Sequence, residues 1–488
     1  MNINGLRIYD SFPMKDIVLI HRNVRMFDNP ALFHGSKNQD YGVVYLYDQN
    51  YWQANGKSEI QLNFLFDCLE DLDQKLKEKN TQIYVFSGNY LDFQKCIETH
   101  FSESIIHANH CTDVGYFRDG FNRFRDHFLK KEKIKLYSDF GIQVKAPNRD
   151  KWASDWEDQM SKPLLKEPYT NQNINKIDKP LKPLNLFLKD FQFQKKKYSS
   201  FQTGGSDLAY SLLDSFLKER CAGYSFKMSS PHEAEHSCSR LSPHIAFGSV
   251  SIREIYQKLL KEIEITGYKK DLNSFKKRLY WHCHFIQKLE TEPELEFNSM
   301  HPLADGLRPD VNNEVIEKWI LGETGFPFLD ACIQYLRKGG WINFRMRAMI
   351  MSFASYNLWQ PWQRTSPLLA ELFVDYEPGI HICQVQMQSG VTGINLPRIY
   401  SVLKQSKDQD PNADWIKAQI PKISNMCIDK IHNAELNDLY FEKLVDPVLS
   451  AKKARETIWA SRSNIEFKKI AKDVYLKHGS RKRQNARF

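Results

Sequence analysis

The chain has 488 residues, of which 42% are hydrophobic and 13% aromatic, so we expect two or three well-buried domains rather than disorder. Its 68 Lys and Arg exceed its 59 Asp and Glu, and the resulting charge of +9 permits a polyanionic partner. No apolar run reaches membrane length, and the nine scattered cysteines include no CxxC pair, so neither a membrane span, a metal site nor a disulfide framework is indicated.

The first part of the chain alternates strand-like and helix-like patterns. Four short apolar runs are typical of strands: Asp16–His21, Tyr41–Tyr47, Gln82–Phe86 and Ser104–Ala108. Between the second and third runs, leucines from Leu65 to Leu76 recur at helical spacing and give one apolar face. Strands that alternate with helices favour right-handed crossovers, so residues 14–146 are predicted to form a doubly wound, Rossmann-like α/β domain with a parallel sheet.

The rest of the chain divides by composition. Residues 147–203 are rich in Lys, Pro, Asn and Gln without a sustained period, which predicts a connector that packs across the surface. Amphipathic patterns at Asp207–Arg220 and Val311–Leu321 predict a mostly helical domain over residues 204–424. Residues 425–488 are expected to form a helical extension that ends in a basic, disordered tail, HGSRKRQNARF.

The segment SCSRLSP, from Ser237 to Pro243, is typical of the start of a helix. Serine side chains can cap free backbone N–H groups, and the same helix end attracts phosphate through its amides and dipole. An ordinary capped helix is the alternative interpretation.

Arg347 and Asp375 form a second candidate pair. If the two meet inside a folded domain they must neutralise each other, since either charge buried alone is costly. A structural salt bridge is the plain alternative.

Three segments alternate basic, aromatic, acidic and glycine positions: WINFRMRAM from Trp341, DYEPGIHICQVQMQSG from Asp375 and LPRIYSVLKQS from Leu396. With SCSRLSP and an early HRNVRMFDNPAL, they resemble the photolyase/cryptochrome family of light-driven FAD proteins over residues 16–418. The resemblance implies an α/β domain followed by an all-α, FAD-binding domain. The FAD contacts that it implies are Tyr224, Cys238, Ser239, Arg240, Leu241, Ser242, Phe275, Arg347, Asp375, Tyr376, Glu377 and His381.

His381 falls at the family position that faces flavin N5, where relatives usually have Asn or Asp. A histidine there could donate a proton or a hydrogen bond, and its charge would respond to pH. The alternative is a core histidine whose ring nitrogens are satisfied by neighbours.

The family passes an electron to excited flavin through a chain of tryptophans. Trp362 matches the middle member, whereas the inner position is Val385 and the outer one falls near Pro309. The usual photoreduction is therefore expected to be impaired or rerouted through Trp319 and Trp359. Core packing is the plain interpretation of those two aromatic residues.

The residues that would meet a DNA lesion match the family less well. Trp281 matches the tryptophan that stacks on a flipped pyrimidine dimer, but Arg278 stands where cyclobutane-dimer enzymes have a glutamate. Phe344 and Ala348 replace the Asn and Met of those enzymes, and also the histidine pair of (6-4) enzymes.

Two further basic residues, Arg345 and Lys404, lie near positions that contact DNA in the family. Solvated surface charge is the alternative explanation for both.

The resemblance leaves two functions open. One is a DNA photolyase, a carbon-carbon lyase that repairs pyrimidine dimers in damaged DNA, with Trp281, Arg278 and His381 as catalytic residues. The other is a cryptochrome-like photoreceptor that signals through a protein partner; a flavoprotein without light function fits only the composition. An antenna pigment is permitted by the family, but His107–Gly115 matches poorly and none is assigned. We expect a monomer in the reducing cytoplasm.

Overall fold

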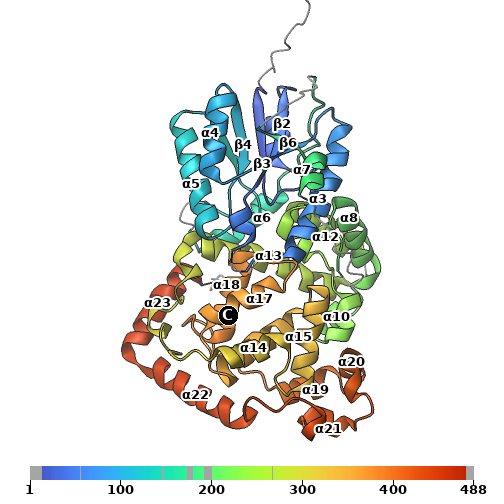
Figure 1. Ribbon diagram of the computed structural model, residues 1–488, viewed down its shortest axis with the longest axis vertical. Helices are drawn as coiled ribbons and strands as arrows, with labels where there is room; N and C mark the ends of the chain where they lie inside the picture. Colours follow the sequence, from blue (N-terminus) through green and yellow to red (C-terminus); the bar gives the residue numbers. More distant parts are fainter. Residues whose placement is uncertain are drawn as a thin grey trace, which may run out of the picture.

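The computed structural model describes residues 14–54, 56–144, 148–172, 180–191, 201–265 and 267–479. An α/β half lies above a larger helical half in Figure 1. The connector between them adds an edge strand to the sheet before the chain enters the helical half. Residues 480–488 of the predicted basic tail lie outside the described residues. Within them, no helix combines the length and the apolar character needed to cross a membrane.

The α/β half is built on a six-stranded sheet in the order β5-β4-β1-β2-β3-β6, with only the edge pair β3 and β6 antiparallel. The strands are β1 (Asp16–Ile20), β2 (Tyr41–Tyr47), β3 (Ile83–Ser87), β4 (Ile105–Asn109), β5 (Ile134–Tyr137) and β6 (Lys182–Pro183). The four strands expected from the sequence are confirmed, and the parallel Rossmann-like order with them. The sheet also has β5 and β6, which the sequence analysis missed.

Helices cover both faces of this sheet: α1 (Pro30–Gly35), α2 (Gln49–Trp52), α3 (Glu59–Lys77), α4 (Tyr90–His100) and α5 (Gly115–Lys130). Along β1, Val18 and Ile20 pack in a cluster with Leu69 of α3, whereas Ile17 packs with Phe93 of α4 on the other face. All four leucines of the predicted apolar face of α3 are buried. Strands buried on both faces need no polar alternation, which explains their continuous apolar runs.

The connector is more ordered than its composition indicated. It contains α6 (Trp152–Ser161), β6 and α7 (Leu184–Asp190), elements that the lack of a sustained period in this stretch had not indicated. Trp152 and Trp156 are each 2% exposed and pack against the helical half, which accounts for the helix. Their spacing, continued by Met160, was a helical signal within an otherwise polar stretch.

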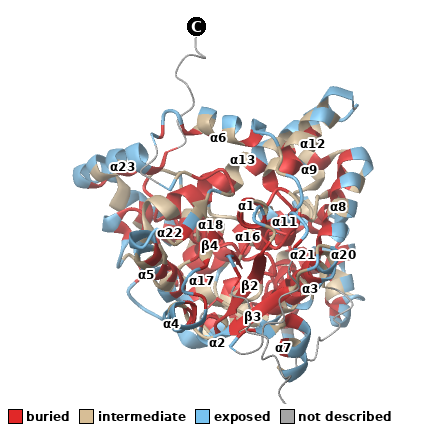
Figure 2. Cartoon of the chain, turned by 90° about the horizontal axis from the view of Figure 1, so that it is seen from above, coloured by how far each residue is buried: buried red, intermediate tan, exposed pale blue. Residues whose placement is uncertain are grey.

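The helical half surrounds several apolar clusters, and buried residues fill its centre and the sheet in Figure 2. Its helices up to the middle of the domain are α8 (Ser206–Ser215), η1 (Phe216–Arg220), α9 (Tyr224–Lys227), α10 (Pro231–Ser237), α11 (Ser242–Phe247), α12 (Ile252–Ile265), α13 (Lys269–Thr291), η2 (Pro293–Glu296), η3 (Pro302–Ala304), α14 (Asn313–Leu321) and α15 (Pro327–Gly339). The others are α16 (Phe344–Ser352), η4 (Phe353–Asn357), α17 (Trp362–Glu371), α18 (Pro378–Ser389), α19 (Val402–Gln409), α20 (Asp414–Gln419), η5 (Pro421–Ile423), α21 (Ile428–Asn433), η6 (Asn437–Leu439), α22 (Pro447–Ser463) and α23 (Ile465–His478). The all-α second domain predicted from the sequence is confirmed.

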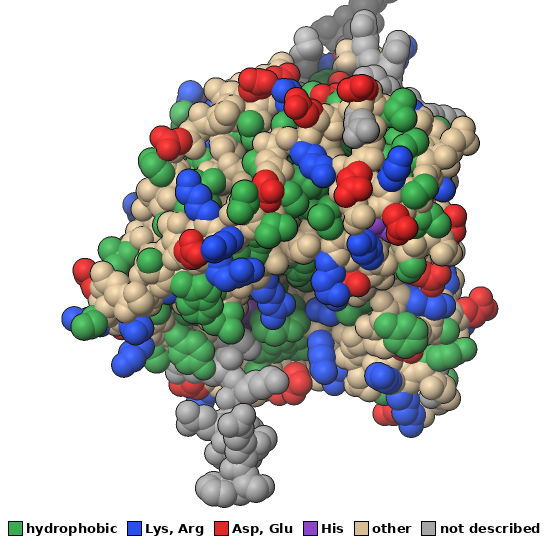
Figure 3. All heavy atoms as spheres, turned by 90° about the horizontal axis from the view of Figure 1, so that it is seen from below, with side chains coloured by type: hydrophobic (Ala, Val, Ile, Leu, Met, Phe, Trp, Pro, Cys, Tyr) green, Lys and Arg blue, Asp and Glu red, His purple; other side chains and the backbone are tan. Residues whose placement is uncertain are grey.

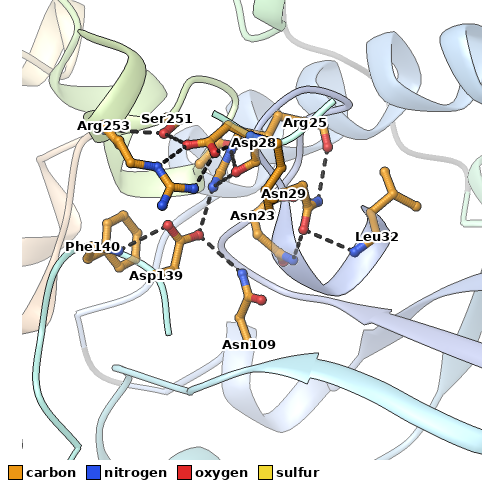
Figure 4. Close-up of polar contacts among 12 residues, drawn as sticks. Asn23, Arg25, Asp28, Asn29, Leu32, Asn109, Asp139, Phe140, Ser251 and Arg253 are labelled. Carbon is orange, nitrogen blue, oxygen red and sulfur yellow. Dashed lines mark hydrogen bonds and ion pairs between the residues drawn. The ribbon is translucent and has the colours of Figure 1, made fainter. Parts of the chain in front are cut away.

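The loop after β1 joins the two halves through buried polar contacts, drawn in Figure 4. Asp28 accepts hydrogen bonds from Ser251 and Arg253 of the helical half, with Arg253 Nε at 3.0 Å. Arg25, which is 2% exposed, pairs with Asp139 at 2.9 Å and donates to the Gly248 carbonyl oxygen at 3.2 Å. The early HRNVRMFDNPAL motif therefore contributes to the domain interface.

Gly248 gives a test of this interface. Its φ is +71°, and an alanine Cβ there would lie 2.0 Å from the Arg22 carbonyl oxygen and 2.8 Å from Asn23 Cα. We expect Gly248→Ala to cost roughly 3 kcal/mol or more, because backbone of the other half would have to move. Thermal unfolding would measure this loss of stability.

Gly306→Ala is the matched control, since its φ is +73° with open space around it, and only the backbone cost of about 1 kcal/mol should appear. Equal effects of the two variants would contradict a close-packed interface at Gly248.

Candidate functional site

The two residues of the predicted pair are in contact: Arg347 comes from α16 and Asp375 from the segment that precedes α18. The two side chains form a bidentate ion pair, with Nη1 to Oδ1 and Nη2 to Oδ2 both at 2.9 Å. Arg347 Nε donates to the Ile342 carbonyl oxygen, and the guanidinium lies 4.3 Å from the Phe373 ring centroid. The Asp375 side chain is 3% exposed, but that of Arg347 is 25% exposed. The fixed guanidinium therefore keeps a face that a bound molecule can reach.

The predicted phosphate-binding segment precedes α11. Ser239 Oγ accepts from the Leu241 backbone N–H at 3.4 Å, and no side chain caps the first turn of α11. Leu241 is fully buried, and its carbonyl oxygen accepts from the Ile245 N–H at 2.9 Å, so it anchors the start of α11 in the core. Arg220 donates to the carbonyl oxygens of Cys238 and Ser239 and so holds the turn that leads into Ser242. The structure thus presents free helix-start amides beside serine hydroxyls, as an anion site requires.

Arg240 lies in the same turn and adopts a left-handed φ of 60°. Its guanidinium is 3.9 Å from the Trp341 ring centroid, and its Nε donates to Gln202 at 3.1 Å. Its Nη1 is buried without a hydrogen-bond partner in the structure. A cation held in this way over an aromatic ring is suited to an anionic group of a ligand.

Three other predicted FAD contacts gather behind this turn. Phe275 of α13 is 5% exposed and packs edge-on against Tyr224, which is itself 6% exposed. Burial raises the pKa of the Tyr224 phenol, which also interacts with Arg278. Burial likewise raises the pKa of the half-buried Cys238 thiol to about 12, so this cysteine is a neutral thiol rather than a thiolate.

Tyr376 and Glu377 connect the site to the α/β half. The Glu377 carboxylate caps α18 by accepting from the Gly379 N–H, and its other oxygen pairs with Arg22 Nη1 at 2.9 Å. The Tyr376 carbonyl oxygen also accepts from Arg22 Nη1, at 3.3 Å. Glu377 therefore faces the domain interface and fixes the start of the helix that carries His381.

Asp113 and Lys57 complete a buried charge network around Arg22. Asp113 accepts from Arg22, Tyr51 and His21, and Lys57 lies 3.5 Å from its other oxygen. Burial lowers the pKa of Lys57 to about 8 and alone would lower that of Arg22. The charges of Glu377 and Asp113 reverse that effect and keep Arg22 ionised. Sequence reasoning missed this network, although Arg22 lies two residues beyond the end of β1, at the sheet edge where ligands and charges gather.

His381 is 9% exposed and lies among Phe373, Tyr376 and Ser366. Its Nε2 is 3.0 Å from the Ser366 carbonyl oxygen and therefore carries the proton that is donated to it. Burial lowers the pKa of His381 to about 4, so the ring is neutral near pH 7. A neutral imidazole can offer hydrogen bonds but is not a proton donor of the imidazolium kind.

The three predicted relay tryptophans are held apart by different partners. Trp362 is 3% exposed and donates to Ser299 at 3.0 Å, whereas Trp319 is fully buried and donates to the Ile350 carbonyl oxygen. Trp359 has a left-handed φ of 56° and stacks under Arg308, whose guanidinium is 4.5 Å from its ring. Among the ring contacts of the described residues, none joins two of these indoles, so any relay through them would be indirect.

The residues predicted to meet DNA lie around α9, α13 and the start of α16. Asn343 occupies the N-cap position of α16 without a side-chain cap hydrogen bond, and its amide donates to the carbonyl oxygens of Met228 and Ser229, at 3.0 and 2.9 Å. Arg278 is exposed and approaches Met228 Sδ at 3.8 Å. Phe344 is 52% exposed, and the half-buried Arg345 has a buried Nε without a hydrogen-bond partner.

Trp281 lies further along α13, half-buried, with its ring stacked on Phe285 at 5.8 Å between centroids. Lys404 is different, because its side chain is 71% exposed and pairs with Asp408 one helical turn away. The structure thus brings Arg278, Phe344 and Arg345 together near Met228, whereas Lys404 lies on the separate helix α19.

The donor set in this region suits a dinucleotide cofactor. Free helix-start amides, the serines and Arg240 match a diphosphate, and the Arg347–Asp375 pair offers fixed donors and acceptors to a polar ring edge. Orphaned buried atoms occur here in Arg240, Asn343 and Arg345, which is the pattern expected where a ligand supplies partners. The end of the helical half is also hollowed, with apolar side chains inside and Lys and Arg around the hollow (Figure 3).

A second crevice lies where the sheet order reverses, at the carboxyl ends of β1 and β4. In parallel sheets this is the common ligand site. Here the cavity holds only about 20 Å³ and is lined by Asn23, Asn109 and Asp139 among others. That is roughly the space of one water molecule, since the network of Figure 4 fills the crevice.

Comparison with known proteins agrees with this arrangement. A family model described as the FAD binding domain of DNA photolyase matches residues 275–461, and one described as DNA photolyase matches residues 16–115. The deoxyribodipyrimidine photo-lyase of Alkalihalophilus pseudofirmus is 24% identical over 444 residues, covering 85% of this chain and 89% of the relative.

Two solved structures share the whole fold. A cryptochrome from Synechocystis superposes with a TM-score of 0.80 at 20% identity, covering 92% of this chain and all of that one. An archaeal photolyase from Sulfolobus tokodaii, solved with two FAD molecules, superposes with a TM-score of 0.77 at 21% identity, covering 91% and 99%.

The fold and the matches define a two-domain protein with an FAD-binding helical half, which confirms FAD as the cofactor expected from the sequence. The chain belongs to the photolyase/cryptochrome family.

The buried His381 gives a pH test. Its folded pKa of about 4 lies below its ordinary value of 6.5, so the unfolded chain takes up the proton first. The stability that the neutral ring contributes is therefore complete above pH 6.5 and is lost as the pH falls toward 4. We expect the wild type to lose about 2 kcal/mol more than His381→Gln between pH 7 and pH 4.5.

Urea unfolding at the two pH values measures this difference. His232→Gln, which removes an exposed histidine of the helical half, is the control and should keep the wild-type pH dependence. Parallel curves for wild type and His381→Gln would show that His381 is not held neutral.

Proposed function

We propose that this protein is a DNA photolyase that repairs pyrimidine dimers under blue or near-UV light. The observation that carries the proposal is the contact between the FAD-binding residues and an exposed aromatic and cationic rim. Tyr224 interacts with Arg278, and Asn343 ties the start of α16, with Phe344 and Arg345, to the end of α9. A lesion held at this rim would lie next to the flavin.

If FAD were held here in its reduced form, it would supply, when excited by light, one electron to the dimer and would take it back after bond cleavage, with no net redox change. Arg347 and Asp375 hold the ring edge, and the turn from Cys238 to Ser242 holds the diphosphate, with Arg240 as a further cation. His381 is neutral and its one ring proton lies on Nε2 toward Ser366, so Nδ1 is left as a hydrogen-bond acceptor for the flavin.

The remaining residues of the proposal meet DNA. Trp281 stacks on the flipped base, since an extruded nucleotide needs an aromatic surface to replace its lost neighbours. Arg278 and Arg345 bind backbone phosphates, and Phe344 fills apolar space at the rim. Lys404 contributes a more distant and weaker phosphate contact, because it already has Asp408 as a partner.

A cryptochrome-like photoreceptor is the second candidate, and one observation favours it. Ile470 and Val474 of α23 pack in the same apolar cluster as Trp281, so the C-terminal extension adjoins the predicted lesion site. A change at the flavin could reach a protein partner through this helix. The buried Val385 at the inner relay position fits this alternative as well, because repair needs the flavin to be reduced.

Flavin binding tests the cofactor assignment. Asp375→Asn should weaken FAD binding by about tenfold or more, because Arg347 loses the charged partner that fixes its guanidinium. Titration of the apoprotein with FAD, followed by flavin fluorescence, measures the affinity. Asp330→Asn is the matched control, since it also removes a buried carboxylate of the helical half, one bound to Thr324 and Tyr440 instead. Unchanged affinity in Asp375→Asn would refute the assigned pocket.

Repair itself is tested with oligonucleotides that carry a defined cyclobutane or (6-4) dimer and with protein holding chemically reduced FAD. We expect restoration of intact bases in light and none in darkness. Trp281→Ala should lower the yield by about tenfold through loss of stacking, whereas Trp319→Phe, far from the rim in the core, should not. Bound, reduced flavin without repair of either lesion would favour the photoreceptor.

A further inference from the structure

A second pocket lies between α22 and the segment that leads into α19. It encloses about 340 Å³ and is lined by Pro397, Arg398, Ile399, Arg455, Ile458 and Trp459. Three of these residues come from one face of α22, because positions 455, 458 and 459 are three and four residues apart. α22 crosses the lower left of the helical half in Figure 1 and continues into α23.

The floor of the pocket is apolar and rigid. Ile458 is 2% exposed and packs with Tyr356 of η4, and Ile399 and Trp359 join the same cluster. Trp459, on the same face of α22 as Ile458, is 48% exposed, so its ring remains open to a ligand. A planar molecule could therefore lie on the indole above a dry floor.

The surroundings of the pocket are strongly cationic. Arg398 and Arg455 are exposed, and within the described part of the chain neither has a carboxylate at ion-pair distance. Among the residues that the structure describes, the hydrogen-bond acceptors of the Arg308 guanidinium are the carbonyl oxygens of Ser355 and Ser389. Within the same residues no acidic side chain neutralises these guanidinium groups.

Arg462 adds a fourth cation, one helical turn beyond Trp459. It donates to the Gly393 carbonyl oxygen at 3.0 Å, and its guanidinium lies 6.0 Å from the Trp459 ring. Its Nη1 is buried without a hydrogen-bond partner. Buried guanidinium donors almost always have a partner, so an unpaired one is better explained by a missing anionic ligand than by ordinary core packing.

We propose that this pocket binds a nucleotide, with its base stacked on Trp459 and its phosphate held by Arg398 and Arg455. Guanidinium groups recognise phosphate through paired hydrogen bonds, and indole rings stack on any base. A volume of 340 Å³ is at the lower end of ligand pockets and suits a single nucleotide rather than a dinucleotide. The ligand is either a free nucleotide or one nucleotide of a DNA strand.

The pocket is separate from the flavin site. Arg347 lies near the start of α16, whereas the pocket rests on Tyr356 of η4, which continues that helix beyond its end. Loss of the pocket residues should therefore leave flavin binding intact, and this proposal does not depend on light-driven repair.

The test uses FAD-saturated protein, so that the flavin site is closed to the probes. Adenosine 5′-monophosphate and a short 5′-phosphorylated oligothymidylate are titrated separately by calorimetry. We expect Arg455→Ala and Trp459→Ala each to weaken binding by about tenfold, since one removes a phosphate contact and the other the stacking surface. Lys453→Ala removes one charge from another face of α22 and should change affinity less than twofold.

Binding of adenosine monophosphate alone identifies a free nucleotide as the ligand. Binding of the oligonucleotide alone identifies a DNA strand only if Arg455→Ala and Trp459→Ala weaken it, because the proposed lesion rim can also bind DNA. Absence of binding for both probes overturns the proposal. It is also overturned if Lys453→Ala weakens binding as much as Arg455→Ala, because the attraction would then be general electrostatics.

Discussion

Arg22 holds the two halves of this molecule together. It extends from the end of β1 into the helical half, where one nitrogen reaches Glu377 and two backbone carbonyl oxygens, while Asp113 accepts from its Nε. Burying so many charges is tolerable only because Arg22 and Lys57 are matched by Asp113 and Glu377. Removal of any member would leave the others uncompensated. The start of α18, and with it His381, therefore takes its position from a residue of the sheet domain.

The electrostatics of the proposed flavin pocket differ from those of this interface. Around Arg22 every charge is enclosed and balanced. Arg347 instead keeps a quarter of its side chain exposed, and its partner Asp375 is almost fully buried. Next to this pair lies His381, which burial keeps neutral near pH 7. The pocket therefore combines one accessible cation with an uncharged hydrogen-bonding ring, and both are fixed by backbone contacts before any ligand arrives.

Periodicity in the sequence was sufficient to predict the helices and strands that bury one apolar face or both. The strands from β1 to β4, the leucine face of α3 and the helices α8 and α14 were all predicted. It was not sufficient where tertiary contacts decide. β6 is two residues long and exists only because β3 offers a free edge, and α6 depends on two tryptophans in a polar stretch. Arg347 and Asp375 were paired through family resemblance, whereas the network around Arg22 joins residues up to 355 positions apart and has no local signal.

The edge strand β6 also bears on how the protein is made. β3 ends at Ser87, but its outer neighbour is supplied by Lys182 and Pro183, about a hundred residues later in synthesis. Until that segment leaves the ribosome, the nascent sheet has an open edge whose backbone groups could pair with another chain. A fragment that ended at residue 146 would retain that open edge permanently. The connector therefore covers the β3 edge of the sheet within the same molecule. A deletion in the connector that removed β6 would expose this edge and favour aggregation.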